Sequence, residues 1–256
     1  MKYFIDTEFL EGTQKGWFGK TTKPTIDLIS VGIVCEDGRE YYAISKDFNL
    51  KEAWNRCDVT RAGFTNSGMT PAYEKVYWIR ENVLKPIWKE LIEKERQYYM
   101  DMFKRINVWT KYIDDDYYKF TYKEFKRLIK KYGKYNKQIA KEIKEFCSVN
   151  ELLGRGIIDR IEPKIPDTIN RNIEFYGYYS DYDWVVFCWL FGKMIDLPKG
   201  FPMYCNDLKQ TLDEKAKHSL AKPITNNLNY PKQINEHNAL ADARWNFELY
   251  KFLNKL

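Results

Sequence analysis

The alternation of apolar and polar positions predicts a β-sheet at the beginning of the chain. Residues 3–6 have the pattern of a strand, residues 26–35 form a long run of β-branched side chains, and residues 39–45 give a third strand pattern. Asp37 and Gly38 separate the last two, and an Asp-Gly pair between strand patterns is a strong signal for a hairpin. We therefore expect three early strands, two of them joined by a tight turn.

Much of the remaining chain has the spacing of helices. Residues 51–55 and 73–99 are predicted to be helical, and apolar residues in the longer segment recur every three or four positions. Pro86 interrupts that segment, so a kink or a break is expected there. A further strand is predicted at residues 173–179, and further helices at residues 138–146, 184–194, 207–218 and 239–253. Strands with flanking helices predict an α/β fold.

The composition is that of a globular protein of moderate size. The chain has 256 residues, of which 44% are hydrophobic and 30% charged, and roughly 150 residues make a domain. The segment at about residues 94–135 is dense in Lys, Arg and Tyr, yet no repeat or Ser/Gly linker accompanies it. We expect one domain over residues 1–256, with a helical insertion at about residues 94–135.

Composition also narrows location and chemistry. The longest apolar runs are far shorter than the ~18 residues of a membrane span, and acids occupy the N-terminus where a signal peptide would be apolar. We expect a cytoplasmic protein without a membrane partner. Five scattered cysteines without a CxxC pair and only two histidines exclude zinc-ribbon and multi-histidine zinc sites, so any metal must bind carboxylates. The net charge of +6 is compatible with a polyanionic partner.

The first strand carries two acids on one face. Side chains alternate along a strand, so Phe4, Asp6 and Glu8 point one way while Tyr3 and Ile5 point the other. Carboxylates that are close together repel each other, and a divalent cation with hard oxygen ligands, Mg²⁺ or Mn²⁺, relieves that repulsion. The alternative is a strand that simply runs into an acidic turn.

A further acid follows the strand at residues 173–179. Ser180 and Asp181 stand at the strand-to-helix junction, where such residues commonly cap a helix. Asp183 instead shares the apolar helix face with Val186, and a buried acid is costly unless it is paired or bound to a metal. We interpret Asp183 as functional and Asp181 as structural.

The last candidate pair is His237 and Asp242. If both were helical, five steps of ~100° would leave their side chains ~140° apart. They converge only if His237 precedes the final helix in a loop and Asp242 lies in its early turns. The small residues Ala239, Ala241 and Ala243 would let this helix lie close to the sheet. The alternative is a surface histidine beside an acid that the helix dipole favours.

In combination these residues predict phosphoryl chemistry. Asp6, Glu8, Asp183 and Asp242 can hold two metal ions that activate water and stabilise both the attacking and the leaving oxygen. His237 is suited to be the general base, because an unperturbed imidazole has a pKa of about 6.5.

The same residues stand in the segments Phe4-Ile5-Asp6-Thr7-Glu8-Phe9, Tyr182-Asp183 and His237-x-Ala239-x-x-Asp242. These segments resemble the three exonuclease motifs of the DEDDh 3′–5′ exonucleases in the ribonuclease H-like superfamily. Within it, the chain is most similar to the RNase T-like group that includes the polyadenylate-specific 3′-exoribonuclease, ribonuclease AS. The similar stretches cover about half of the chain.

The resemblance implies a ribonuclease H-like mixed sheet of five strands, three antiparallel and the others parallel, flanked by helices. It implies hydrolysis of single-stranded RNA from the 3′-OH end with release of nucleoside 5′-monophosphates. Adenine-rich 3′ ends and a homodimer are expected from the same group. The implied roles are metal binding by Asp6, Glu8, Asp183 and Asp242, proton removal by His237, and contact with the terminal nucleotide by Phe9 and Leu10.

Two other functions stay open, a 3′–5′ exonuclease on DNA ends and a nucleic-acid-binding module without catalysis. The intact set of acids argues against the second of these. The role of the predicted insertion has two interpretations as well, because its basic and aromatic residues fit either a single-strand contact surface or an ordinary solvated helical surface. Its cations are Lys94, Arg96, Lys104, Arg105, Lys111, Lys123, Lys126, Arg127, Lys130 and Lys131.

Overall fold

The computed structural model describes residues 1–14, 18, 20–21, 23–64, 71–105, 118–147, 173–217 and 223–256. The chain divides into two units. The first comprises Met1–Phe9, Ile26–Asp47 and Lys134–Leu256, and the second comprises Leu10–Thr25 and Phe48–Gly133. The expectation of one domain with an insertion at about residues 94–135 stays a prediction. Residues 106–117 of that segment, and His218, lie outside the described residues.

The first unit is built on a five-stranded sheet with the order β3-β2-β1-β6-β7. Its strands are β1 (Lys2–Gly12), β2 (Thr25–Cys35), β3 (Glu40–Ile44), β6 (Glu174–Gly177) and β7 (Asn206–Asp207). β2 and β3 are antiparallel, whereas β6 is parallel to both β1 and β7. Glu36, just after β2, donates a hydrogen bond to the carbonyl of Lys2 at the start of β1, so these strands also run in opposite directions. The mixed sheet confirms the predicted α/β class and is consistent with a ribonuclease H-like fold.

The hairpin between β2 and β3 turns where the sequence predicts. Gly38 has a φ of +89°, a conformation that costs a glycine little, and its N–H donates to the carbonyl of Cys35 at 2.9 Å. The register pairs Val34 with Glu40 and Ser30 with Ile44.

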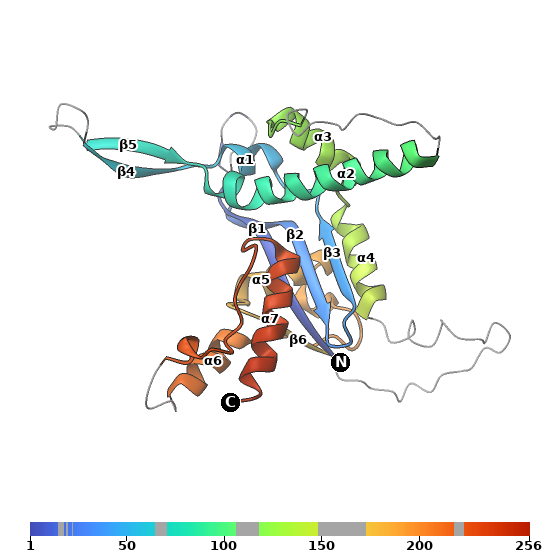
Figure 1. The fold of residues 1–256 in the computed structure, drawn as a ribbon, viewed down its shortest axis with the longest axis vertical. Coiled ribbons are helices and arrows are strands. Elements are labelled where there is room, and N and C mark those ends of the chain that lie inside the picture. Colours follow the sequence, from blue (N-terminus) through green and yellow to red (C-terminus); the bar gives the residue numbers. More distant parts are fainter. Residues whose placement is uncertain are drawn as a thin grey trace. The chain divides into compact units, whose positions relative to one another are not determined.

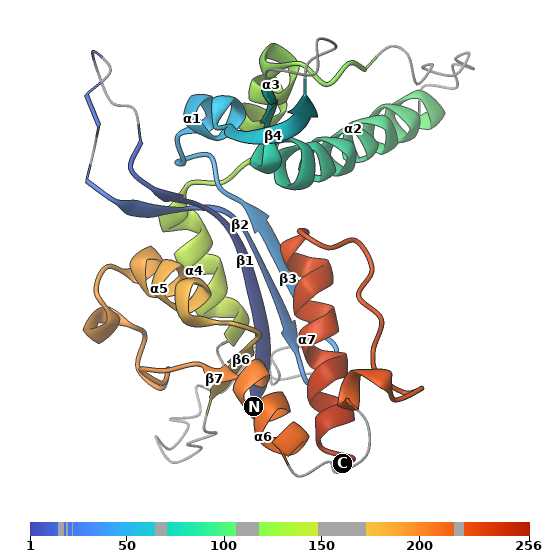
Figure 2. The same cartoon turned by 90° about the vertical axis from the view of Figure 1, so that its left-hand side faces the viewer.

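Helices cover both faces of this sheet, as Figure 2 shows. α4 (Asn136–Cys147) and α5 (Asp181–Phe191) lie on one face and α7 (Ala239–Leu253) lies on the other. α6 (Leu208–Lys217) packs on α7, and two short 3-10 turns, Met194–Asp196 and Ile224–Asn226, complete the unit. The predicted helices 138–146, 184–194, 207–218 and 239–253 all exist, within a few residues of their expected ends.

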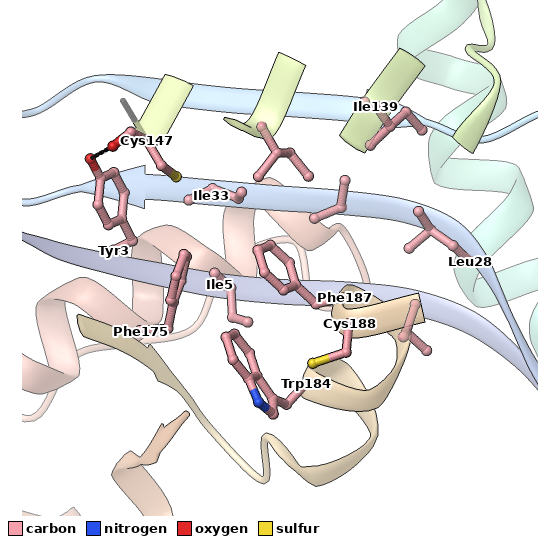
Figure 3. Packing of buried hydrophobic residues seen from close by; sticks show 14 of the residues in the cluster. Tyr3, Ile5, Leu28, Ile33, Ile139, Cys147, Phe175, Trp184, Phe187 and Cys188 are labelled. Carbon is pink, nitrogen blue, oxygen red and sulfur yellow. Dashed lines mark hydrogen bonds between the residues drawn. The ribbon is translucent and has the colours of Figure 1, made fainter. Parts of the chain in front are cut away.

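The strand alternation of β1 sorts its side chains between the two faces. Tyr3 and Ile5 belong to the core under α4 and α5, together with Phe175 and Phe187 (Figure 3). Phe4 lies on the other face, in a cluster with Ala243 of α7 and Val34. Both cores are made of side chains that are almost completely buried. The predicted two-faced pattern is confirmed.

The second unit contains α1 (Leu50–Asn55), β4 (Asp58–Phe64), β5 (Pro71–Val76), α2 (Lys85–Arg105) and α3 (Tyr122–Tyr132) (Figure 1). β4 and β5 form a separate antiparallel ribbon. The prediction of a helix from residue 73 was therefore wrong for residues 73–76. The side chains of residues 73–75 are exposed, so no buried face imposed a period of two on the sequence.

Pro86 changes the helix locally, as its missing N–H requires. A π-helical turn over Arg80–Leu84 precedes it, and α2 continues from Lys85 to Arg105. π-turns are one of the ways in which a helix accommodates an interruption of its hydrogen-bond ladder. The expected disturbance is present without a break.

Among the described residues, no helix is both long and apolar enough to cross a membrane. The five cysteines are free thiols.

Candidate active site

Three carboxylates from two elements meet on the α7 face of the sheet. Asp6 and Glu8 project from β1, and Asp242 comes from the first turns of α7. One carboxylate oxygen of each lies within 4.8 Å of the other two. Residues 236 positions apart in the chain therefore share one small volume, which the strand alternation of β1 and the position of α7 bring about together.

α7 approaches the sheet closely because β2 presents a glycine. A Cβ atom on Gly32 would lie 2.2 Å from the carbonyl oxygen of Ala239, the first residue of α7. Ala239 and Ala243 are fully buried there, whereas Ala241, which was expected to help in the same way, is only half-buried. The sequence analysis missed Gly32, whose place in an apolar strand was the available signal.

Asp183 lies near this group but is held from the other side of β1. Its Oδ1 accepts hydrogen bonds from the backbone N–H of Thr7 at 2.8 Å and from the Thr7 hydroxyl at 2.6 Å. Thr7 stands between Asp6 and Glu8 and points the opposite way, so it links α5 to the acidic segment of β1. Both bonds engage Oδ1, which fixes the orientation in which Asp183 presents Oδ2.

The acids perturb one another strongly. Burial, followed by the charges of Asp183, Glu8 and Asp242, raises the pKa of Asp6 well above its usual value. Burial and the charges of Asp242 and Asp183 raise the pKa of Glu8 to about 8. Burial also raises the pKa of Asp183 to about 6, although the Thr7 hydrogen bonds oppose this. Four acids whose negative charges penalise one another form a site that favours a bound cation.

Asp242 is oriented by the loop that precedes α7. Its Oδ2 accepts a hydrogen bond from the backbone N–H of His237 at 2.9 Å, and its Oδ1 accepts one from the side chain of Gln233 at 2.6 Å. Burial raises the pKa of Asp242, and the Gln233 and His237 hydrogen bonds lower it in part. Gln233 was also missed, since no helical or strand pattern marks the loop.

His237 lies in the loop before α7, as it must if its side chain is to approach Asp242. It precedes α7, which begins at Ala239 after the N-cap Asn238, whose side chain accepts from the N–H of Ala241. His237 has a φ of +65°, an unusual conformation for a non-glycine residue and one often found at functional sites. His237 is half-buried, and a positive charge on its imidazole lowers the pKa of Asp242.

The two acids of α5 differ in burial as expected, but the predicted helix cap needs a correction. Asp183 is 7% exposed, whereas Asp181 is an exposed first helical residue. The predicted cap was wrong, because the N-cap is Ser180 and its side chain makes no capping bond. The backbone N–H of Ser180 instead bonds the carboxylate of Asp207 at 3.0 Å. Trp184 belongs to the core and donates its indole N–H to the carbonyl of Met203.

The two residues predicted to touch the substrate differ in exposure. Phe9 is half-buried and packs edge-on against Tyr182, with ring centroids 5.9 Å apart. Leu10 is completely buried. Tyr182 is 53% exposed and directly precedes Asp183, so an accessible aromatic surface lies beside the acids.

The donor set fits hard divalent cations. The group offers carboxylate oxygens only, and their mutual repulsion is relieved by positive charge. Neighbouring donors already orient two of the acids, as is usual around a metal site. Asp6, Glu8 and Asp242 could ligate one ion directly, with Asp183 at its side.

The mixed sheet and the acids grouped around its first strand define the chain as an α/β protein with a cluster of carboxylates that fits a divalent cation. The chain belongs to the family described as the 3′-5′ exoribonuclease Rv2179c-like domain, whose model matches residues 1–253. The expected enzyme class, a 3′-5′ exoribonuclease, is thereby confirmed.

Two curated proteins of Mycobacterium tuberculosis are similar to this chain. They are the 3′-5′ exoribonuclease MT2234.1 of strain CDC 1551 / Oshkosh and the 3′-5′ exoribonuclease Rv2179c of strain ATCC 25618 / H37Rv. Each is 24% identical over 244 residues, which cover 95% of this chain and 88% of the relative.

Proposed function

We propose that this chain hydrolyses single-stranded RNA from its 3′-OH end and releases nucleoside 5′-monophosphates with the help of two Mg²⁺ or Mn²⁺ ions. The observation that carries the proposal is the meeting of Asp6, Glu8 and Asp242 within 4.8 Å. Family membership supports the exoribonuclease activity, and the motifs support a place among the DEDDh enzymes near ribonuclease AS.

The oxygens that would hold the ions come from different elements. Asp6 and Glu8 supply oxygens from a rigid central strand, and Asp242 supplies one from α7. Asp183 adds an oxygen whose direction Thr7 fixes. The bound ions would supply an activated water and stabilise the charge on the attacking and leaving oxygens.

His237 is the proposed general base. Its backbone is tied to Asp242, so its imidazole stays near the acids while one ring nitrogen accepts the proton of the attacking water. The loop position lets the ring turn toward the substrate, which a position inside α7 would prevent.

The terminal nucleotide is proposed to contact Phe9 and Leu10. The exposed ring of Tyr182 next to Phe9 extends this surface, whereas Leu10 must first become accessible. A preference for adenine-rich ends and assembly as a homodimer are the further parts of this proposal, which rest on the resemblance.

The test uses matched RNA and DNA oligonucleotides with free or blocked 3′ ends and with A, C, G or U at the terminus. We expect one-nucleotide shortening of RNA with a free 3′-OH, loss of activity in EDTA, and recovery with Mg²⁺ or Mn²⁺. Degradation of blocked ends or full activity in EDTA would refute the mechanism. Equal or faster degradation of DNA would instead favour the DNA exonuclease.

A further inference from the structure

α3 is the most densely basic helix in the described part of the chain. Its eleven residues, YKEFKRLIKKY, include five cations and one acid. The helix is amphipathic, with Phe125, Leu128 and Ile129 buried. The cations therefore lie on the sides and the outer face, and the structure divides them into two sets.

The first set serves the fold. Arg127 and Lys131 both bind Glu95 of α2, which is 1% exposed. Lys131 Nζ lies 2.7 Å from Glu95 Oε1, and Arg127 makes two parallel contacts, at 2.9 Å and 2.5 Å, to the two oxygens of the same carboxylate. These cations compensate a buried charge, and no further role is needed to explain them.

The second set has no such explanation. Lys123, Lys126 and Lys130 are exposed, and none of them makes an ion pair with any residue that the structure describes. Their spacing of three and four places them in one row on the helix surface, where like charges repel. Such a row weakens the helix slightly unless an anion binds to it.

An exposed aromatic ring lies at the same helix. Tyr98 of α2 is 57% exposed, and its ring centroid is 5.3 Å from Nζ of Lys131. Surfaces for single-stranded nucleic acid combine cations that follow the phosphates with rings on which bases stack. Acidic proteins and anionic lipids would use the lysines, but neither offers a series of flat bases to stack on the ring of Tyr98.

We propose that Lys123, Lys126, Lys130 and Tyr98 form a binding surface for single-stranded RNA, separate from the acids that act on the 3′ end. The lysines bind successive phosphates, and Tyr98 stacks on a base. The inference rests on the proposed function only in its choice of RNA as the polyanion, since the surface lies in a different unit from the catalytic acids.

The test compares Lys123→Gln/Lys126→Gln/Lys130→Gln with a control triple variant of equal net charge, Lys199→Gln/Lys217→Gln/Lys255→Gln, which replaces exposed lysines of the first unit. Binding of a labelled 20-nucleotide RNA is measured by anisotropy in EDTA at several salt concentrations. We expect the α3 variant to bind at least 10-fold more weakly and to lose about 2 from the slope of log K against log salt, about 0.7 for each lost phosphate contact. The control should stay close to wild type.

Tyr98 is tested in the same assay. Tyr98→Ala should weaken binding roughly 5- to 100-fold, the range expected for one base stack, whereas Tyr98→Phe should restore it. The α3 variant should keep its melting temperature, because removing like charges relieves repulsion. Wild-type RNA affinity in that variant, or equal losses in the control, would overturn the proposal. If the three substitutions weaken binding to phosphatidylserine vesicles but leave RNA binding unchanged, the RNA surface is rejected in favour of a membrane-binding surface.

Hydrolysis of a four-nucleotide RNA in Mg²⁺ separates this proposal from the proposed function. The α3 variant should cleave this short substrate as the wild type does, because its three phosphates and its 3′ end are proposed to bind at the acids and not at the lysines of α3. If neither the wild type nor the α3 variant cleaves the four-nucleotide RNA, but the α3 variant still binds the 20-nucleotide RNA more weakly, the proposed activity is refuted and the binding surface is supported. If the wild type and the α3 variant both cleave the four-nucleotide RNA and bind the 20-nucleotide RNA equally well, only the proposed binding surface is refuted.

Discussion

The side-chain amide of Asn246 donates a hydrogen bond of 2.8 Å to the carbonyl oxygen of Ile5. Asn246 is 1% exposed and lies one helical turn after Asp242, and Ile5 directly precedes Asp6. Pairing between β1 and β6 extends from Lys2 to Phe4, so this carbonyl lies just beyond it. The bond therefore links β1 and α7, which carry three of the four candidate ligands, at the point where these two elements meet.

Asn246→Ala should lower the free energy of unfolding by about 1–3 kcal/mol, because a buried carbonyl loses its donor. It should also slow RNA hydrolysis, since Asp242 and Asp6 lose a common anchor. Asn254→Ala is the matched control, because the exposed Asn254 makes an equally short bond to the carbonyl of Tyr250. Urea unfolding of both variants gives the comparison, and equal effects would show that the buried bond has no special role.

The choice between the two acids of α5 is tested by Asp183→Asn and Asp181→Asn. Asp183→Asn should abolish hydrolysis, because the amide no longer offers the charged oxygen that Thr7 orients. Asp181→Asn should remain largely active, since this residue is exposed at the start of the helix. Initial rates on one RNA substrate decide the matter. An inactive Asp181→Asn enzyme would show that the wrong acid was chosen.

The raised pKa values make the metal-free fold sensitive to pH. An acid whose folded pKa lies above its unfolded value stabilises the fold at low pH, and that contribution is lost as pH rises through the folded pKa. For Glu8 and Asp183 this loss occurs up to about pH 8 and about pH 6, respectively. In EDTA at pH 8, Asp6→Asn should therefore melt several degrees higher than wild type, and the difference should vanish near pH 4.

Calorimetry with and without Mg²⁺ extends this measurement. The ion should raise the melting temperature of the wild type at pH 8 and have little effect on Asp6→Asn, which should also be inactive. A variant that melts lower than the wild type in EDTA at pH 8 would contradict the repulsion between these acids.

His237→Ala should reduce the turnover rate by about 10²- to 10⁴-fold, the usual loss for a general base. Binding of RNA should change little, because the bond from His237 to Asp242 uses the backbone and survives the substitution. Single-turnover rates and anisotropy titrations measure the two effects separately. A loss of binding equal to the loss of rate would assign His237 to substrate contact.

The sequence predicted the elements whose local pattern and burial agree. The final helix was expected over residues 239–253 and is found over Ala239–Leu253, because its small buried residues and its cap mark both the face and the start. The two-faced first strand was predictable for the same reason, since Phe4 and Ile5 pack on opposite sides.

What could not be predicted depends on contacts between distant segments. Gly32 matters only because α7 lies against it, and Asn246 matters only because the carbonyl of Ile5 is available beside it. The sequence did not indicate the ribbon of β4 and β5, because its strands pair with each other and the side chains of residues 58–60 and 73–75 are exposed, so hydrophobic periodicity does not mark them. Pairing and close approach leave no period in the sequence.

The buried charge cluster of the second unit gives a final prediction. The hydrogen bond from Arg127 lowers the pKa of Glu95 to about 2 against burial, and Lys131 adds to this effect. Glu95→Gln should lower the free energy of unfolding by about 2–3 kcal/mol at pH 7, less than the ~3–5 kcal/mol of a fully buried pair because both cations are partly exposed. Urea unfolding monitored by circular dichroism measures the change.

The effect of Glu95 must also depend on pH in a definite direction. A carboxyl group with a lowered folded pKa stabilises the fold above its unfolded pKa of 4.5, and this contribution is lost as pH falls toward about 2. The difference between wild type and Glu95→Gln should therefore be constant above about pH 5.5 and shrink as the solution is acidified. Glu93→Gln is the control, because Glu93 is 71% exposed and lies 3.8 Å from Arg96. If Glu93→Gln matched Glu95→Gln at every pH, the burial of Glu95 would not be the source of its effect.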